Sequence, residues 1–164
     1  MNTTHRTTTN AILGLVFVTG LGLTAYLIAV SWGGLYWLFD CLVGAVAGVL
    51  ALLRGPRRTW PVAGGLAVAA VAVVVARVAD LPQEPGPVTG LALAVLVGSG
   101  IRTLPGPRAA AVAAGGFTVV VGTWLTALPD AVGFTVVTIV NTVTWLVAVV
   151  LGTSLRVTGR GLVT

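Results

Sequence analysis

The sequence predicts an all-α integral membrane protein, a six-transmembrane-helix bundle with both termini in the cytoplasm. Hydrophobic residues make up 57% of the 164 residues and charged residues only 8%, and the mean hydropathy is +1.05. Because a soluble domain carries about 25% charged residues, this chain lacks the polar side chains to cover a globule in water. Two further observations support the prediction: the length of the apolar runs and the distribution of charge between them.

Six apolar runs are long enough to cross a bilayer, which takes about 17 to 25 residues per helix. The runs cover residues 11–30, 35–53, 61–79, 88–104, 109–128 and 134–152. Proline stands beside the start of three of them, at Pro61, Pro87 and Pro107, where the first turn of a helix tolerates it. Three glycines in the fourth run also allow that segment to be tilted, broken or partly re-entrant.

The charges orient these runs. If the amino terminus is cytoplasmic, eight of the nine arginines fall on the inside. The acids fall on or near the outside, and they are Asp40, Asp80, Glu84 and Asp130. Because arginine-rich loops stay in the cytoplasm, this separation predicts a multi-pass protein of the plasma membrane. One membrane domain, 11–152, would then lie between a cytoplasmic amino-terminal segment, 1–10, and a cytoplasmic tail, 153–164.

Asp40 is the first candidate functional residue, because a carboxylate about 7 Å inside an apolar helix needs compensation. Arg77 lies at a similar depth in the next, antiparallel run. The two side chains either form a pair that holds protons or a polar ligand, or reach the interface separately. In the second case Arg77 pairs with Asp80, three residues further on.

Aromatic residues surround Asp40 at the outer end of the first two runs. Trp32, Tyr36 and Trp37 form either an ordinary interfacial belt or, together with Asp40 and Arg77, a shallow outer cup. A cup with aromatic walls and these charges suits an amphiphile, a lipid headgroup or a hydrophobic peptide.

Polar residues recur along one face of the sixth run, at intervals of three and four residues. They are Thr138, Asn141, Thr142 and Trp145, and we expect this face to point inward. Asparagine in hydrocarbon favours an interhelical hydrogen bond. These four residues, which we call the seam, therefore either stabilise the contact between helices or form part of a transport path. Gly44 and Gly48 on the second run permit a close approach between helices.

The sequence lacks the residues of several functional classes. With Cys41 as the single cysteine and His5 as the single histidine, it offers no intramolecular disulfide and no Cys/His ligand set for a metal. No catalytic motif is recognisable, so we expect no catalytic residues, no cofactor and no enzymatic activity. The arginines between apolar runs are explained by membrane orientation and predict no nucleic-acid binding.

Together with the six runs, the basic loop RGPRRTWPV and the final LGTSLRVTGR resemble the amino-terminal membrane sensor region of actinobacterial sensor histidine kinases. The resemblance implies the membrane part of a two-component sensor. This sequence contains no phosphoacceptor helix and no ATP-binding motif, so no family site is carried over and a partner would have to complete the signal.

The sequence therefore predicts a non-enzymatic membrane sensor or interaction module that responds to an amphiphile or to envelope stress. The expected partners are membrane lipid, an amphiphilic ligand or peptide, and a second copy or another membrane protein. Two alternatives remain open. One is a small transporter or channel subunit with a polar path through Asp40, Arg77 and Asn141, and the other is an accessory subunit of a membrane complex.

Overall fold

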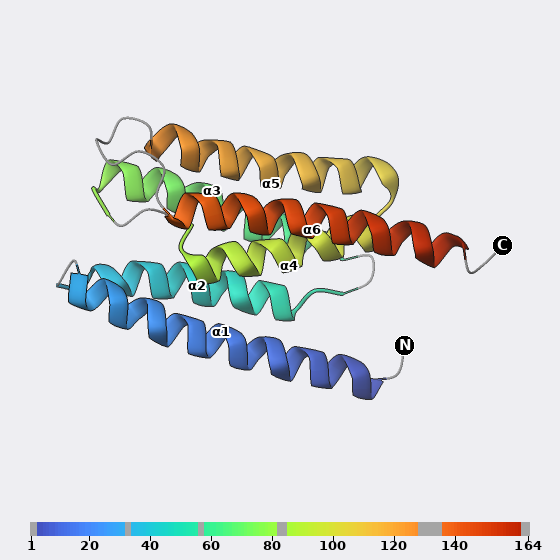
Figure 1. The fold of residues 1–164 in the computed structure, drawn as a ribbon, viewed down its shortest axis with the longest axis horizontal. Helices are drawn as coiled ribbons and strands as arrows, with labels where there is room; N and C mark the ends of the chain where they lie inside the picture. The colour runs from blue at the N-terminus through green and yellow to red at the C-terminus, as the bar shows by residue number, and fades with distance from the viewer. Residues whose placement is uncertain (1–2, 32–33, 56–57, 82–84, 128–135, 162–164) are drawn as a thin grey trace.

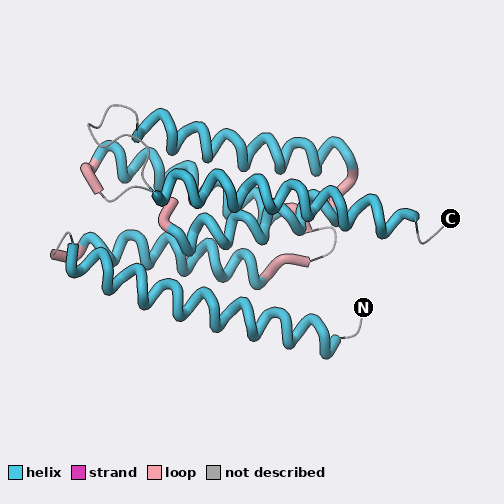
Figure 2. Tube along the Cα trace, viewed as in Figure 1, coloured by secondary structure: helices cyan, strands magenta, loops and turns pink. Residues whose placement is uncertain are grey.

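The computed structural model describes residues 3–31, 34–55, 58–81, 85–127 and 136–161. Within these ranges the chain folds into six helices and contains no strand (Figures 1 and 2). The helices are α1 (Thr3–Ser31), α2 (Tyr36–Leu52), α3 (Trp60–Val78), α4 (Pro87–Thr103), α5 (Gly106–Ala127) and α6 (Val136–Gly161). The prediction of an all-helical fold with one helix for each apolar run is confirmed.

Four of the helices are long and apolar enough to cross a membrane. Their apolar segments are Thr7–Ser31, Trp60–Val78, Gly106–Leu125 and Val136–Gly159. The other two, α2 and α4, have 17 residues each. At 1.5 Å per residue these two are about 26 Å long, slightly shorter than the hydrocarbon core of a typical bilayer, about 30 Å.

Two helices extend beyond the apolar runs. α1 begins at Thr3 rather than at residue 11, and α6 continues to Gly161 rather than ending at residue 152. Apolar composition marks where a helix meets lipid, whereas backbone hydrogen bonding continues wherever nothing interrupts it. In the α6 extension the hydroxyl of Thr153 donates to the carbonyl of Val149, one turn earlier. Most of the predicted terminal segments, 1–10 and 153–164, is therefore continuous helix.

α4 is the central helix of the bundle and packs against each of the other five. It is continuous from Pro87 to Thr103, so the broken alternative for the fourth run is wrong. Its glycines serve close packing instead. A Cβ at Gly98 would lie 3.3 Å from the carbonyl oxygen of Ala148, and one at Gly152 would lie 2.9 Å from the carbonyl oxygen of Gly98. The backbones of α4 and α6 therefore touch.

Small residues also line the other helix contacts. A Cβ at Gly44 would lie 2.7 Å from Leu21 of α1, and one at Gly48 would lie 3.3 Å from Phe17, so α2 packs closely on α1 as its glycines predicted. The buried core joins α1, α2, α3 and α4 through Phe17, Ala47, Ala51, Val62, Val88, Ala92 and Leu96. Alanine and glycine let these helices approach closely enough for dispersion contacts to hold them together.

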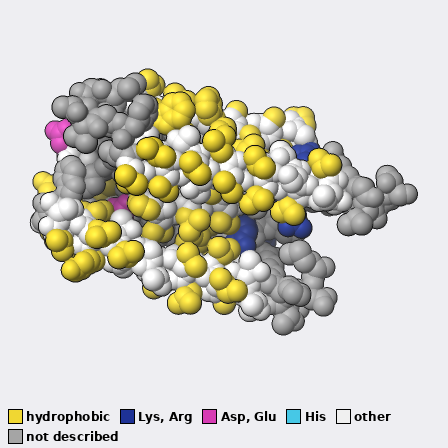
Figure 3. Space-filling model, viewed as in Figure 1, with side chains coloured by type: hydrophobic (Ala, Val, Ile, Leu, Met, Phe, Trp, Pro, Cys, Tyr) yellow, Lys and Arg dark blue, Asp and Glu magenta, His cyan; other side chains and the backbone are white. Residues whose placement is uncertain are grey.

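The charged side chains separate toward the two ends of the bundle. The first turn of α1, the last turn of α6, and the α2–α3 and α4–α5 connections all lie at one end (Figure 1). The arginine side chains in view gather there, and the acidic side chains in view lie toward the opposite end (Figure 3). Asp40 near the start of α2, and Arg77 and Asp80 near the end of α3, belong to that opposite end. We call these the arginine end and the acidic end.

Candidate functional site

Asp40 lies buried at the start of α4. It is the fifth residue of α2, and its side chain is only 4% exposed. Its carboxylate rests against Gly86, the residue that precedes the first turn of α4. A Cβ at Gly86 would overlap Asp40 Oδ1 and lie 3.0 Å from Cγ. The absence of a side chain at Gly86 is therefore what makes room for the carboxylate.

The position of Asp40 provides the compensation that a buried carboxylate needs. The first N–H groups of a helix have no acceptor within that helix, and the helix dipole adds partial positive charge at the same end. Both favour an anion beside Gly86. The backbone at Gly86, with φ −63° and ψ 168°, is open to any residue, so the requirement for glycine is one of space.

Asn141 reaches the same turn of α4 from α6. It is 6% exposed, and its Nδ2 donates a 2.6 Å hydrogen bond to the carbonyl oxygen of Pro85. A Cβ at Gly90 would overlap Asn141 Oδ1 and lie 3.0 Å from Cγ. Gly86 and Gly90 are one helical turn apart and share a face. They accommodate Asp40 from α2 and Asn141 from α6.

Thr89 Oγ1 and Asn141 Oδ1 are buried in this region without a hydrogen-bond donor among the described residues. Thr89 is fully buried, and its hydroxyl lies 3.6 Å from the position that a Cβ at Gly44 would take. We refer to Asp40, Gly86, Thr89, Gly90 and Asn141 as the polar cluster.

The other seam residues lie on α6 before and after Asn141. Thr138 is 1% exposed, and the hydroxyl of Thr142 accepts a 3.0 Å hydrogen bond from Trp124 Nε1 of α5. Trp145 is partly buried, and its Nε1 has no acceptor among the described residues. A Cβ at Gly116 would lie 2.8 Å from that nitrogen. The seam thus packs against both α4 and α5.

Arg77 is placed apart from the polar cluster. Its Nη1 lies 4.0 Å from Asp80 Oδ1, and the two side chains are 47% and 93% exposed. This Arg77–Asp80 pair is the alternative to an Asp40–Arg77 pair that the sequence allows. Asp80 adopts a left-handed φ of 49° after the end of α3, and the Leu81 N–H bonds back to the carbonyl of Ala76. That helix-ending turn holds Asp80 near Arg77.

The aromatic residues predicted to surround Asp40 lie only partly within the described residues. Tyr36 is exposed and Trp37 half-buried, while Trp32 lies outside the described residues. An apolar groove of about 340 Å³ lies between α2 and α3, and Phe39 lines it together with aliphatic residues. Asp40, Arg77, Tyr36 and Trp37 are not among its lining residues.

Sequence reasoning missed the residues of α4 that complete the polar cluster. Gly86 directly precedes α4, and Thr89 and Gly90 lie in its first turn, where the sequence predicts only a helix start. Comparisons with protein-family models, with curated proteins and with solved structures find no match for this chain.

Proposed function

We propose that the chain is a multi-pass membrane protein whose six helices all cross the bilayer, with the arginine end in the cytoplasm. Its large apolar side chains face outward, with Val78 80% and Val136 76% exposed (Figure 3). An apolar surface of this extent suits lipid rather than water. The separation of arginines from acids favours cytoplasmic placement of both termini.

Within that membrane, we propose that the protein acts as a non-enzymatic sensor or interaction module. The observation that carries this proposal is the attachment of α6 to α4 near both ends. Asn141 donates to the carbonyl of Pro85 at 2.6 Å, and Arg156 Nη1 donates to the carbonyl of Ile101 at 3.0 Å. The first bond joins α6 to the residue two positions before α4, and the second joins α6 to α4 itself. From these two attachments we infer that α4 and α6 move as one unit.

This unit links the polar cluster to the cytoplasm. A partner that displaces Asp40 from Gly86 would shift the start of α4, and α6 would carry the shift toward Gly161. A signal requires that the partner bind two arrangements of the bundle with different affinities. A cationic amphiphile or peptide is the ligand that fits the acidic end and its aromatic residues. The end of α6 would pass the structural change to a cytoplasmic partner. The resemblance to sensor kinases motivates a kinase as that partner.

A transporter is the second candidate, and one observation favours it. Thr89 Oγ1 and Asn141 Oδ1 are buried oxygens without a donor among the described residues. Thr89 belongs to the first turn of α4, which Asp40 contacts at Gly86, and Asn141 Oδ1 lies against Gly90 of that turn. Such oxygens suit a proton or a small cation in transit.

The deciding experiment uses the full chain in liposomes. Spin labels at Thr59→Cys and Val157→Cys, in a Cys41→Ser background, report the distance between the start of α3 and the last turns of α6. Dodecyltrimethylammonium is the probe, at a concentration below micelle formation, and proton and sodium flux are measured on the same preparation. Asp40→Asn is the matched variant, because it removes the charge and keeps the shape.

The sensor predicts a change of about 2 Å in this distance, the size of interhelical shifts in other switches. The change should disappear in Asp40→Asn, and no flux should accompany it. An unchanged distance in the unsubstituted chain would contradict the sensor. Proton or sodium flux that depends on Asp40 would support the transporter function instead of the sensor function.

A further inference from the structure

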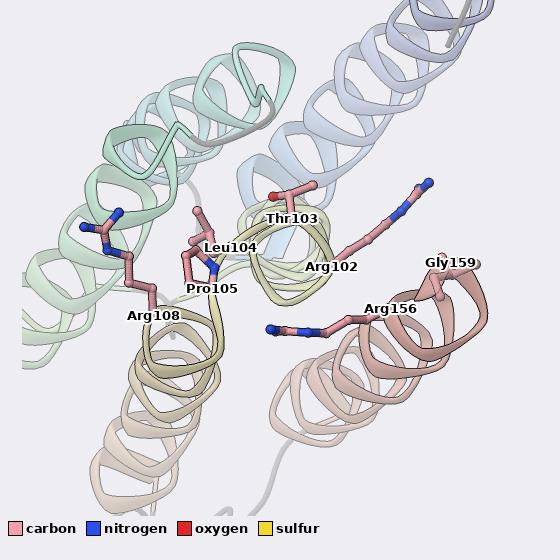
Figure 4. A pocket seen from close by; sticks show the side chains of 8 residues that line it. Arg102, Thr103, Leu104, Pro105, Arg108, Arg156 and Gly159 are labelled. Atoms are coloured by element: carbon pink, nitrogen blue, oxygen red, sulfur yellow. The ribbon is translucent and has the colours of Figure 1, made fainter. Parts of the chain in front are cut away.

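A second site lies at the arginine end, where α4, α5 and α6 meet. A cavity of about 520 Å³ opens there beside the α4–α5 turn (Figure 4). Its lining residues are Arg102, Thr103, Leu104, Pro105, Arg108, Leu155, Arg156 and Gly159. Three of the eight are arginines and none is acidic, so the cavity concentrates positive charge that no lining residue neutralises.

Arg156 is the fixed member of the three. It is half-buried, and its Nη1 donates to the carbonyl of Ile101 near the end of α4. Its Nη2 lies 3.8 Å from the position that a Cβ at Gly106 would take, at the start of α5. The guanidinium therefore lies between α4 and α5. One of its five N–H groups is used by Ile101, which leaves donors for a ligand.

Arg102 and Arg108 flank this fixed group. Arg156 reaches from α6 toward the α4–α5 turn, while Arg102 and Arg108 extend from α4 and α5 in opposite directions (Figure 4). Both are exposed, so their long side chains can turn toward a bound anion. Leu104 is buried, whereas Pro105 and Leu155 add exposed apolar surface beside the charges. The cavity thus combines cations with apolar walls.

Membrane orientation alone does not explain this arrangement. Positive charge in cytoplasmic loops does not require three arginines to line one cavity, and Arg58 on the α2–α3 connection lies outside it. Arg102, Arg108 and Arg156 place three like charges along the lining of one cavity, and an anion bound there would reduce their mutual repulsion. Guanidinium groups pair with phosphoryl oxygens through two parallel hydrogen bonds, and basic pockets between membrane helices suit lipid headgroups.

We propose that this cavity binds a phosphoryl group, carried either by an anionic phospholipid headgroup or by free phosphate. The apolar residues beside the arginines would contact the glycerol and upper acyl region in the first case. The proposal depends only on the cavity and its arginines. It can therefore be tested independently of the proposed sensor function and of the polar cluster at the acidic end.

The test adds increasing amounts of a probe to the purified full chain in neutral detergent. The thermal unfolding midpoint is measured at each concentration. The probes are phosphatidylglycerol, phosphatidylcholine and inorganic phosphate. Arg156→Gln removes the fixed guanidinium, and the double variant Arg102→Gln with Arg108→Gln leaves the bond to Ile101 in place. Arg58→Gln is the matched control, because it removes the same charge at the same end outside the cavity.

We expect saturable stabilisation by phosphatidylglycerol and not by phosphatidylcholine. Affinity should fall about 10-fold or more in both cavity variants and less than about 2-fold in Arg58→Gln, since each guanidinium supplies charge-assisted hydrogen bonds. Equal stabilisation by inorganic phosphate would identify free phosphate as the source, and a response to phosphatidylglycerol alone would identify the lipid. Equal losses in Arg58→Gln and the cavity variants, or no preference for either phosphate-bearing anion over phosphatidylcholine, would overturn the proposal.

Discussion

The amide of Asn141 donates a 2.6 Å hydrogen bond to the carbonyl oxygen of Pro85, which fixes the beginning of α6 against the residues that start α4. The two residues are 56 positions apart in the chain. Asn141 can approach this closely because Gly90 has no side chain. The register between α4 and α6 therefore depends on one polar residue and one glycine together.

The first prediction concerns that dependence. Gly90→Ala should destabilise the protein by about 1–3 kcal/mol, because the new methyl group overlaps Asn141 Oδ1 and forces the amide away from Pro85. In an Asn141→Ala background the same substitution should be neutral, or stabilising by up to about 1 kcal/mol, since alanine is the better helix former. Titration of dodecyl sulfate into mild detergent micelles measures both values. Additive effects would show that Asn141 does not occupy the space beside Gly90.

The second prediction concerns Asp40 and Gly86. Gly86→Ala should be costly in the unsubstituted chain, because its methyl group overlaps the Asp40 carboxylate. After Asp40→Ala the cost should fall by about 1 kcal/mol or more, as expected for residues in direct contact. The same unfolding titration gives the coupling. A coupling near zero would place the carboxylate elsewhere and would remove Asp40 from the polar cluster.

The third prediction compares two glycines on α6. Gly152→Ala should destabilise the bundle by about 1–3 kcal/mol, because its Cβ meets the backbone of Gly98 and no rotamer change relieves the contact. Gly159→Ala is the matched control, since nothing lies within 4 Å of its Cβ position. Gly159→Ala should leave stability unchanged or raise it slightly. Equal effects of the two substitutions would argue against backbone contact between α4 and α6.

Hydropathy predicts the number and order of the helices, because a short segment containing glycine separates each apolar run from the next. It does not predict where α1 begins or where α6 ends. Beyond the apolar run of α6, threonine hydroxyls satisfy carbonyls one turn back, as Thr158 does with Ser154 at 3.1 Å, and the helix continues. Nothing in the hydropathy of these residues distinguishes a continued helix from a polar tail.

The inward position of Asn141 could be predicted from its spacing with Thr138, but the partner of Asp40 could not. Adjacency along the chain favoured Arg77, because α2 and α3 are consecutive and antiparallel. The packing of α4 against α2 brings Gly86 to Asp40 instead. Which helices become neighbours depends on the fit of many small side chains, and that information is not contained in the pattern of any one run.

The cavity at the arginine end also could not be predicted from the sequence. In the sequence, Arg102, Arg108 and Arg156 indicate only membrane orientation, and each lies near a helix end. That all three line one cavity depends on the continuation of α6 past residue 152, which brings Arg156 to the carbonyl of Ile101. A tail of irregular structure would have left these charges apart.

In the proposed arrangement, six helices cross the bilayer and both termini lie at the arginine end in the cytoplasm. Single cysteines in a Cys41→Ser background test this arrangement through a membrane-impermeant maleimide, at Leu35, Arg58, Asp80, Pro105 and Gly159. We expect Leu35→Cys and Asp80→Cys to be labelled in intact cells. Arg58→Cys, Pro105→Cys and Gly159→Cys should be labelled only after permeabilisation. Labelling of any of these last three in intact cells, or protection of Asp80→Cys, would contradict the six-span arrangement.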